Sequence, residues 1–86
     1  MDIAKLRSDV KSAMEEYVAT PEAWEDAVIA INPANGKVEL LESEEAEALP
    51  QDSIDIWNPM DLVEMTPDGA WKVDDENLDS LVDDYN

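Results

Sequence analysis

The sequence contains no cysteine and no histidine, and it has only two glycines among its 86 residues. Without cysteine, no disulfide can brace the fold and no thiolate can act as a nucleophile or as a metal ligand. Without histidine, the usual base at neutral pH is missing, and no serine can be activated by one. Two isolated glycines cannot build a glycine-rich phosphate-binding loop. We therefore expect a protein that is not an enzyme and that holds no cofactor.

Long apolar segments are also missing. No run of about 18 apolar residues is present, so no transmembrane helix is predicted. The N-terminal residues do not form the basic stretch and apolar run of a signal peptide, and we therefore expect a cytoplasmic protein. The length corresponds to one domain, residues 1–86. A hydrophobic content of 44 % is that of a folded domain rather than of a disordered acidic tail.

Positive charge is scarce as well, since five basic residues stand against 23 acidic ones and the formal net charge is −18. The imbalance lies in one part of the chain. Residues 1–38 carry seven acids and four bases, whereas residues 39–86 carry sixteen acids and a single base, Lys72. Solubility of a small domain needs a net charge of only about 2–8 in magnitude. The excess in the second part therefore calls for a further explanation.

The first half of the chain predicts a helix followed by a hairpin. Apolar residues three and four positions apart predict an amphipathic helix over about 2–19. Within it, Lys5 with Asp9 and Lys11 with Glu15 are spaced to form ion pairs. Two β-prone runs around a Pro/Asn/Gly turn predict a hairpin over 27–41. The first run is apolar throughout, so we expect a central strand covered on both faces, with the second nearer an edge.

The second half predicts shorter elements. Residues 43–48 suit a helix but lack an apolar stripe, so we expect an acidic loop or a short exposed turn. Alternating residues predict a possible third strand over 53–57. Asn58-Pro59 favours a short helix over 60–65, while a competing interpretation pairs 62–65 with 70–73 as a second hairpin. An apolar stripe predicts a C-terminal helix from about Asp75. The expected fold is α+β, with an N-terminal helix and one or two C-terminal helices around a small antiparallel sheet.

Acidic residues in the predicted C-terminal helix are unusually placed. Asp75, Asp79 and Asp83 form a stripe of like charge, and no base lies in the helix. Asp83 and Asp84 stand at its C-terminal end, where the helix dipole disfavours negative charge. A second acidic stretch, with no basic residue in it, covers residues 42–47. The predicted partner-binding residues are Glu42, Glu44, Glu45, Glu47, Asp75, Glu76, Asp79, Asp83 and Asp84.

The clustered acids and the three tryptophans have simpler explanations than a metal site or a partner-binding site. The acids lack the glycine and ligand spacing of a calcium loop, so no metal site is expected. Three tryptophans in a chain without phenylalanine are expected to fill the core. One of them, Trp71, lies beside a predicted turn and is a possible aromatic anchor for a partner.

A cationic partner would account for the uncompensated acids. A helix of twelve residues is about 18 Å long, and with an acidic loop it could approach the charge density of duplex DNA, about one charge per 1.7 Å. In size and charge the chain resembles small phage-encoded DNA-mimic inhibitors of restriction or CRISPR enzymes, and it is similar to acidic immunity proteins that neutralise nuclease toxins. The resemblance lies in composition and includes no motif.

This resemblance implies a non-catalytic inhibitor or decoy that blocks the basic surface of a nucleic-acid-binding protein or nuclease. Such a protein would act in the cytoplasm of a bacterial host and would contact neither nucleic acid nor membrane directly. The alternative is a small adaptor or housekeeping domain whose charge only confers solubility.

Overall fold

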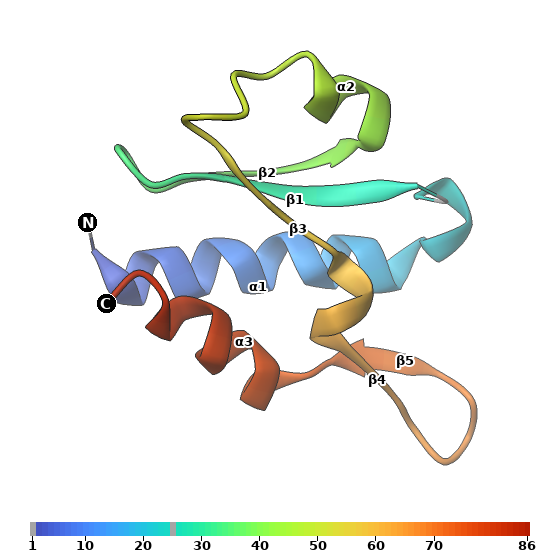
Figure 1. The fold of residues 1–86 in the computed structure, drawn as a ribbon. Coiled ribbons are helices and arrows are strands. Elements are labelled where there is room, and N and C mark those ends of the chain that lie inside the picture. The colour runs from blue at the N-terminus through green and yellow to red at the C-terminus, as the bar shows by residue number, and fades with distance from the viewer. Residues whose placement is uncertain (1, 25) are drawn as a thin grey trace.

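The computed structural model describes residues 2–24 and 26–86, and it has the α+β fold that the sequence predicts. The first three strands form one antiparallel sheet and the last two form another (Figure 1). In chain order the elements are α1 (Ile3–Ala19), the 3-10 turn η1 (Pro21–Ala23), β1 (Ala27–Asn32), β2 (Lys37–Glu42), α2 (Ser43–Glu47), β3 (Asp55–Trp57), the 3-10 turn η2 (Pro59–Leu62), β4 (Val63–Met65), β5 (Trp71–Val73) and α3 (Asp75–Asp83).

The two long helices confirm the predicted amphipathic patterns. The Asp2 carboxylate accepts a hydrogen bond from the Lys5 backbone N–H and caps the start of α1. In the same way, the Asp74 carboxylate accepts from the Asn77 N–H at the start of α3. Apolar residues three and four positions apart are buried on the inner side of each helix. They are Leu6, Val10, Met14 and Tyr17 in α1, and Leu78, Leu81 and Val82 in α3.

The larger sheet has the strand order β2-β1-β3, so β1 is central and β2 lies at an edge, as predicted. Ile29 of β1 stands opposite Leu40 of β2 and opposite Trp57 of β3. The β1–β2 turn places Gly36 at a φ of 73°, a conformation that glycine adopts without steric cost. The third strand is also confirmed, although it is limited to Asp55–Trp57.

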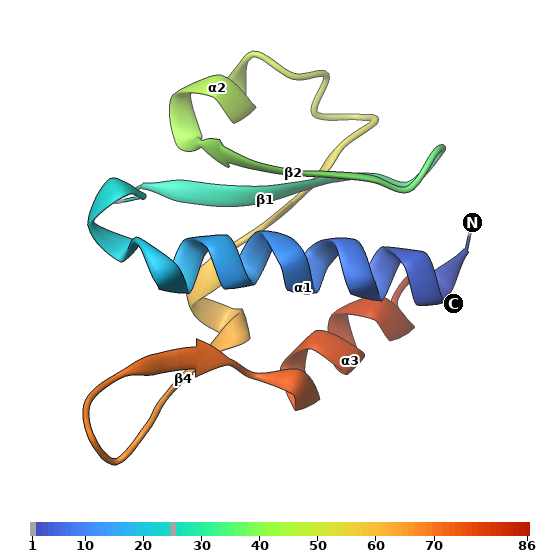
Figure 2. The same cartoon turned by 180° about the vertical axis from the view of Figure 1, so that it is seen from behind.

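The two faces of this sheet are covered by different elements. Ile29 and Ile31 belong to the main core with residues of α1 and α3. Ala30 points to the other face, because neighbouring strand residues alternate sides, and it is buried there outside that core. Figures 1 and 2 show α2 and the segment after it on this second side, with α1 and α3 on the first.

The expectation of an acidic loop or a short exposed turn over 43–48 is corrected by the helix α2, which is seated on the sheet. Residues Ser43–Glu47 are helical, and Ala46 is 4 % exposed. One alanine is enough to seat so short a helix against the sheet, and one alanine does not produce an apolar stripe that periodicity can detect.

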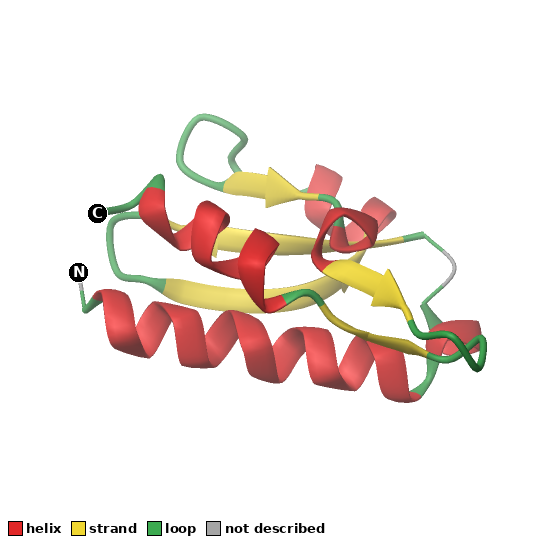
Figure 3. Ribbon diagram, turned by 90° about the horizontal axis from the view of Figure 1, so that it is seen from below, coloured by secondary structure: helices red, strands yellow, loops and turns green. Residues whose placement is uncertain are grey.

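The short helix predicted over 60–65 is wrong, and the competing hairpin is confirmed. A 3-10 turn ends at Leu62, and β4 then pairs with β5 so that Val63 stands opposite Val73. The connecting turn is closed by a 2.7 Å hydrogen bond from the Thr66 N–H to the Ala70 carbonyl, and it places Gly69 at a φ of 85°. The helix-start signal at Asn58-Pro59 is realised, since the Asn58 side chain accepts from the Met60 N–H at the start of η2, but the turn residues and the β-branched valines end this 3-10 turn at Leu62. Figure 3 shows this hairpin extending beyond the N-terminal end of α3.

Candidate protein-binding surface

Every Lys and Arg side chain of the protein lies within 3.5 Å of a carboxylate oxygen. A hydrogen bond to the paired carboxylate raises the pKa of the Lys5, Lys37 and Lys72 ammonium groups, which stay protonated at neutral pH. The carboxylate partners are Asp9 for Lys5, Asp75 and Asp79 for Arg7, Asp75 for Lys11, Glu39 for Lys37 and Glu64 for Lys72. No basic side chain is therefore left to offset the remaining acids.

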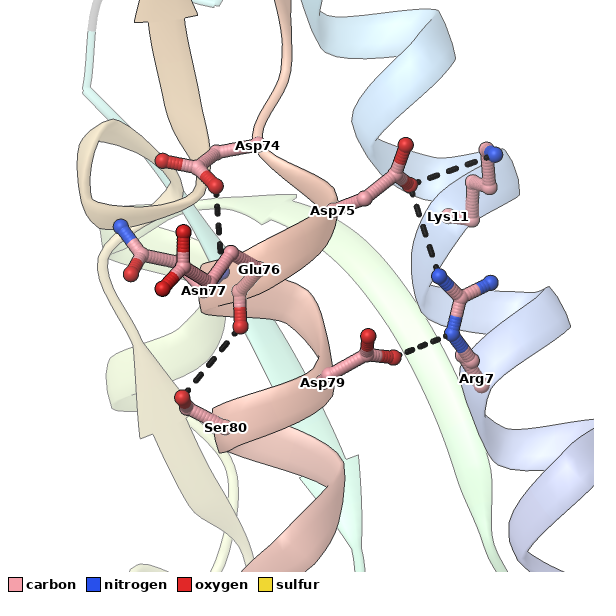
Figure 4. Close-up of polar contacts among 8 residues, drawn as sticks. All are labelled: Arg7, Lys11, Asp74, Asp75, Glu76, Asn77, Asp79 and Ser80. Atoms are coloured by element: carbon pink, nitrogen blue, oxygen red, sulfur yellow. Dashed lines mark hydrogen bonds and ion pairs between the residues drawn. The ribbon is translucent and has the colours of Figure 1, made fainter.

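A cluster of four charges joins α1 to α3 (Figure 4). The Arg7 Nε atom donates to Asp79 at 2.6 Å, and an Arg7 terminal nitrogen lies 3.5 Å from Asp75. Lys11 Nζ lies 3.3 Å from the same Asp75 oxygen. These contacts compensate two members of the acidic stripe from another helix, so Asp75 and Asp79 hold α3 against α1 rather than facing a partner unpaired. The expected pair of Lys5 with Asp9 is present at 2.8 Å, whereas Lys11 bonds to Asp75 instead of Glu15.

The outer side of α3 carries the acids without a basic neighbour. Glu76, Asp83 and Asp84 are exposed, and none of them makes an ion pair among the described residues. Glu76 and Asp83 are seven residues apart, two helical turns, so they lie on one side of the helix and away from buried Leu78. The dipole at the C-terminal end of α3 does not favour Asp83 or Asp84. These three residues are the part of the predicted α3 site that remains available to a partner.

The other predicted acidic stretch lies elsewhere. Glu44, Glu45 and Glu47 are exposed on α2, while Glu42 is half-buried at the end of β2. Because α2 and α3 lie on opposite sides of the larger sheet, the fold separates the two stretches that the sequence analysis combined (Figure 2). A flat partner surface can contact one of them at a time.

Two acids beside α3 were missed by the sequence analysis. Asp55 accepts a 2.7 Å hydrogen bond from the Tyr85 hydroxyl, which in turn accepts one of 2.9 Å from the Trp57 indole N–H. Asp61 lies in η2 and lines a hollow together with Asp84. Nothing in the local pattern marks these residues, because their proximity to α3 arises from the return of the chain through β3 and η2.

The surroundings of the Tyr85 hydroxyl, including its contact with Asp55, change its pKa by an amount that can be measured. Burial raises the pKa of Tyr85 from 10.0 to about 12, and the hydrogen bond to Asp55 adds to this effect. The neutral phenol therefore contributes stability that is complete below pH 10 and is lost as the pH rises through about 12.

In a Tyr17→Phe variant, where Tyr85 is the one remaining tyrosine, we expect the ultraviolet absorbance of phenolate to appear around pH 12. Adding Asp55→Ala should lower the midpoint but leave it above 10, since burial persists. Circular dichroism recorded at each pH monitors the fold. A midpoint at 10 in the folded Tyr17→Phe protein would contradict the half-buried position of Tyr85 and its hydrogen bond to Asp55.

The predicted anchor, Trp71, is half-buried on β5. Its ring centroid lies 6.3 Å from that of Tyr17, and it packs against the main core. The Trp71 side chain therefore packs partly against the core and partly lines a surface hollow beside Met65.

The structure and comparisons with known proteins give three further findings. In residues 2–24 and 26–86, no group of three or more acids converges as a metal site would, and no polar or charged side chain is buried. None of the helices described is both long and apolar enough to cross a membrane.

Comparison of the chain with protein-family models, with curated proteins and with solved structures returned no match. Function is therefore inferred from the residues and their geometry.

Proposed function

We propose that this protein is a non-catalytic acidic binding protein that occupies the basic surface of a nucleic-acid-binding protein or nuclease, as a decoy for nucleic acid. The observation that carries the proposal is the internal pairing of all five basic side chains. Of the 23 acids, five belong to those pairs and Glu25 lies outside the described residues, so seventeen described acids have no basic partner. Toward a partner the surface therefore presents a large excess of negative charge.

The charge density supports a comparison with DNA. The molecule measures 39 × 28 × 15 Å and carries a net charge of −18. This corresponds to about one charge per 2 Å of its longest dimension, close to the one per about 1.7 Å of duplex DNA. A groove that binds DNA through phosphate contacts would attract such a surface at long range and accelerate association.

We assign the contact to the α3 side rather than to the α2 side. Asp84, at the end of α3, lines hollows with Asp55 and with Asp61, so this side brings together carboxylates from β3, η2 and the end of α3. The acids of α2 come from one short helix and the strand before it. Carboxylates contributed by several segments can match basic side chains that are spread over a partner surface.

The test is binding to a panel of purified nucleases and repressors that have basic DNA-binding grooves, measured by fluorescence anisotropy across a salt series. We expect tight binding to at least one member at 50 mM salt, weakening steeply as the salt concentration rises. An equally charged acidic peptide without a fold serves as the control for nonspecific attraction. Absence of binding to every member at low salt would favour the adaptor or housekeeping alternative.

A further inference from the structure

Three large hydrophobic side chains are exposed among the described residues, and two of them, Met60 and Met65, line neighbouring hollows. Ile56, Met60 and Met65 are 40, 48 and 66 % exposed. They come from β3, η2 and β4, three consecutive elements of the second half of the chain. Single exposed apolar residues are common on protein surfaces, whereas a contiguous set marks an interaction site.

Met60 and Met65 line two of three adjoining hollows, whereas Ile56, which pairs with Ala30, points to the α2 face of the sheet and borders the remaining hollow. The central hollow, of about 600 Å³, lies between η2 and α3 and contains Met60. It shares Trp57 and Asp84 with a second hollow, which contains Ile56. It shares Met60 and Val63 with a third, which contains Met65. The hollows are therefore neighbours along the surface, and we call the stretch from the β3 edge of the sheet to the β4–β5 hairpin the methionine groove.

The rim of the methionine groove is acidic. Asp61 and Asp84 line the central hollow, and Asp55 lines the second. Glu64 lines the third, where Lys72 neutralises it. No Lys or Arg side chain is among the described residues that line the three hollows. Apolar side chains therefore lie next to carboxylates in these hollows, with the polar Asn77 and Ser80 also lining the central one.

The apolar side chains and the carboxylates together favour one kind of binding partner over others. A second copy of the chain would bring another net charge of −18 against these carboxylates, which opposes association. A bilayer with anionic lipids would be repelled in the same way. Nucleic acid has the same sign of charge and lacks an aliphatic face. A cationic protein segment with one apolar side complements both the apolar side chains and the acidic rim, and flexible methionine side chains adapt to varied apolar partners.

We propose that the methionine groove binds a cationic amphipathic helix of the partner. Its apolar side chains contact Trp57, Met60 and Met65, and its Lys or Arg side chains pair with the carboxylates of Asp55, Asp61 and Asp84. This inference rests on the proposed function, which requires a cationic partner, and adds that recognition includes an apolar anchor. The electrostatic contribution sets the rate of encounter, and the apolar contact distinguishes one basic partner from another.

The test uses a synthetic helical peptide of leucine and lysine with its leucines at i, i+3, i+4 and i+7, and a scrambled peptide of the same composition. We expect the amphipathic peptide to bind the full protein at least about tenfold more tightly at 0.15 M salt. In spectra of methyl-labelled methionine, the Met60 and Met65 signals should shift. The Met14 signal should not, because Met14 is fully buried in the main core.

The variant Met60→Gln/Met65→Gln keeps the net charge. We expect it to lose about tenfold in affinity for the amphipathic peptide and to bind the scrambled peptide as before. Met60→Leu/Met65→Leu should retain binding. The matched control, Ala19→Gln/Ala48→Gln, adds two amides at exposed positions outside the groove and should change neither affinity.

The outcomes separate this inference from the proposed function. Equal binding of both peptides, unaffected by the glutamine variant, would overturn the groove and leave a charge-driven decoy intact. Failure of both peptides and of every basic protein in the panel at 50 mM salt would overturn both proposals. A dimer that sedimentation detects in the unmodified protein and not in the glutamine variant would also overturn the groove assignment, because a second copy would then occupy it.

Discussion

Reversing the three exposed acids of α3, in the variant Glu76→Lys/Asp83→Lys/Asp84→Lys, is expected to weaken binding to the cationic partner by about 100-fold or more at 0.15 M salt. These carboxylates have no basic neighbour among the described residues, so reversal replaces attraction with repulsion without breaking an ion pair. The fold should persist, because lysine near the C-terminal end of a helix is favoured by the dipole and offsets the loss of Glu76 near its start. Asp75 and Asp79 are left unchanged because they hold Arg7 and Lys11.

The matched control is Glu44→Lys/Glu45→Lys/Glu47→Lys on α2. Each variant replaces three negative charges by three positive ones, so both change the net charge by six, from −18 to −12. At 0.15 M salt the screening length is about 8 Å, and a charge on the far side of the sheet acts weakly on the contact. We expect the α2 variant to lose about fivefold or less. Equal losses would show that total charge matters and the α3 side does not, and a larger loss in the α2 variant would place the site there.

Truncating Leu78 to alanine is expected to cost about 2–5 kcal/mol of the free energy of unfolding. Leu78 is fully buried in the core that α3 forms with α1 and the larger sheet. A protein of this length has a total stability of about 4–13 kcal/mol, so the loss is a large fraction of it. The expected fall in Tm is about 10 °C or more.

The control for this prediction is Leu49→Ala, measured by the same urea and thermal unfolding. Leu49 is half-buried on the α2 side of the sheet, outside the main core, and its truncation removes the same number of atoms. We expect it to cost less than half as much as Leu78→Ala. Equal losses from the two variants would contradict a core concentrated on the α1–α3 side.

The sequence predicts the parts of the fold whose patterns are long and local. The helical periods of α1 and α3 and the apolar run of β1 each extend over enough residues to identify the element. The pattern fails at α2, where Ala46 is the one buried residue, and at Leu62–Met65, where a helix start and a strand compete within a few positions. In both places a short segment takes its conformation from what it packs against.

The candidate surface was less predictable than the fold, because its electrostatics depend on contacts distant in sequence. Arg7 and Asp79 are 72 residues apart, and no local rule indicates that one neutralises the other. Asp83 and Asp84 were identified correctly as acids that no base in their own helix compensates, because helix electrostatics is local. The division of the acids between two sides of the sheet, and the proximity of Asp55 and Asp61 to α3, required the tertiary structure.

The central claim is that this protein takes the place of nucleic acid on a basic protein surface. It is tested most directly by measuring the apparent Kd of a partner from the panel for a labelled DNA duplex while the concentration of this protein is increased. Mutually exclusive binding predicts that the apparent Kd rises in proportion to the added protein without reaching a plateau, and that the α3 variant shifts this rise to about 100-fold higher concentration. A plateau, or an apparent Kd that does not change although the protein is bound, would contradict the claim.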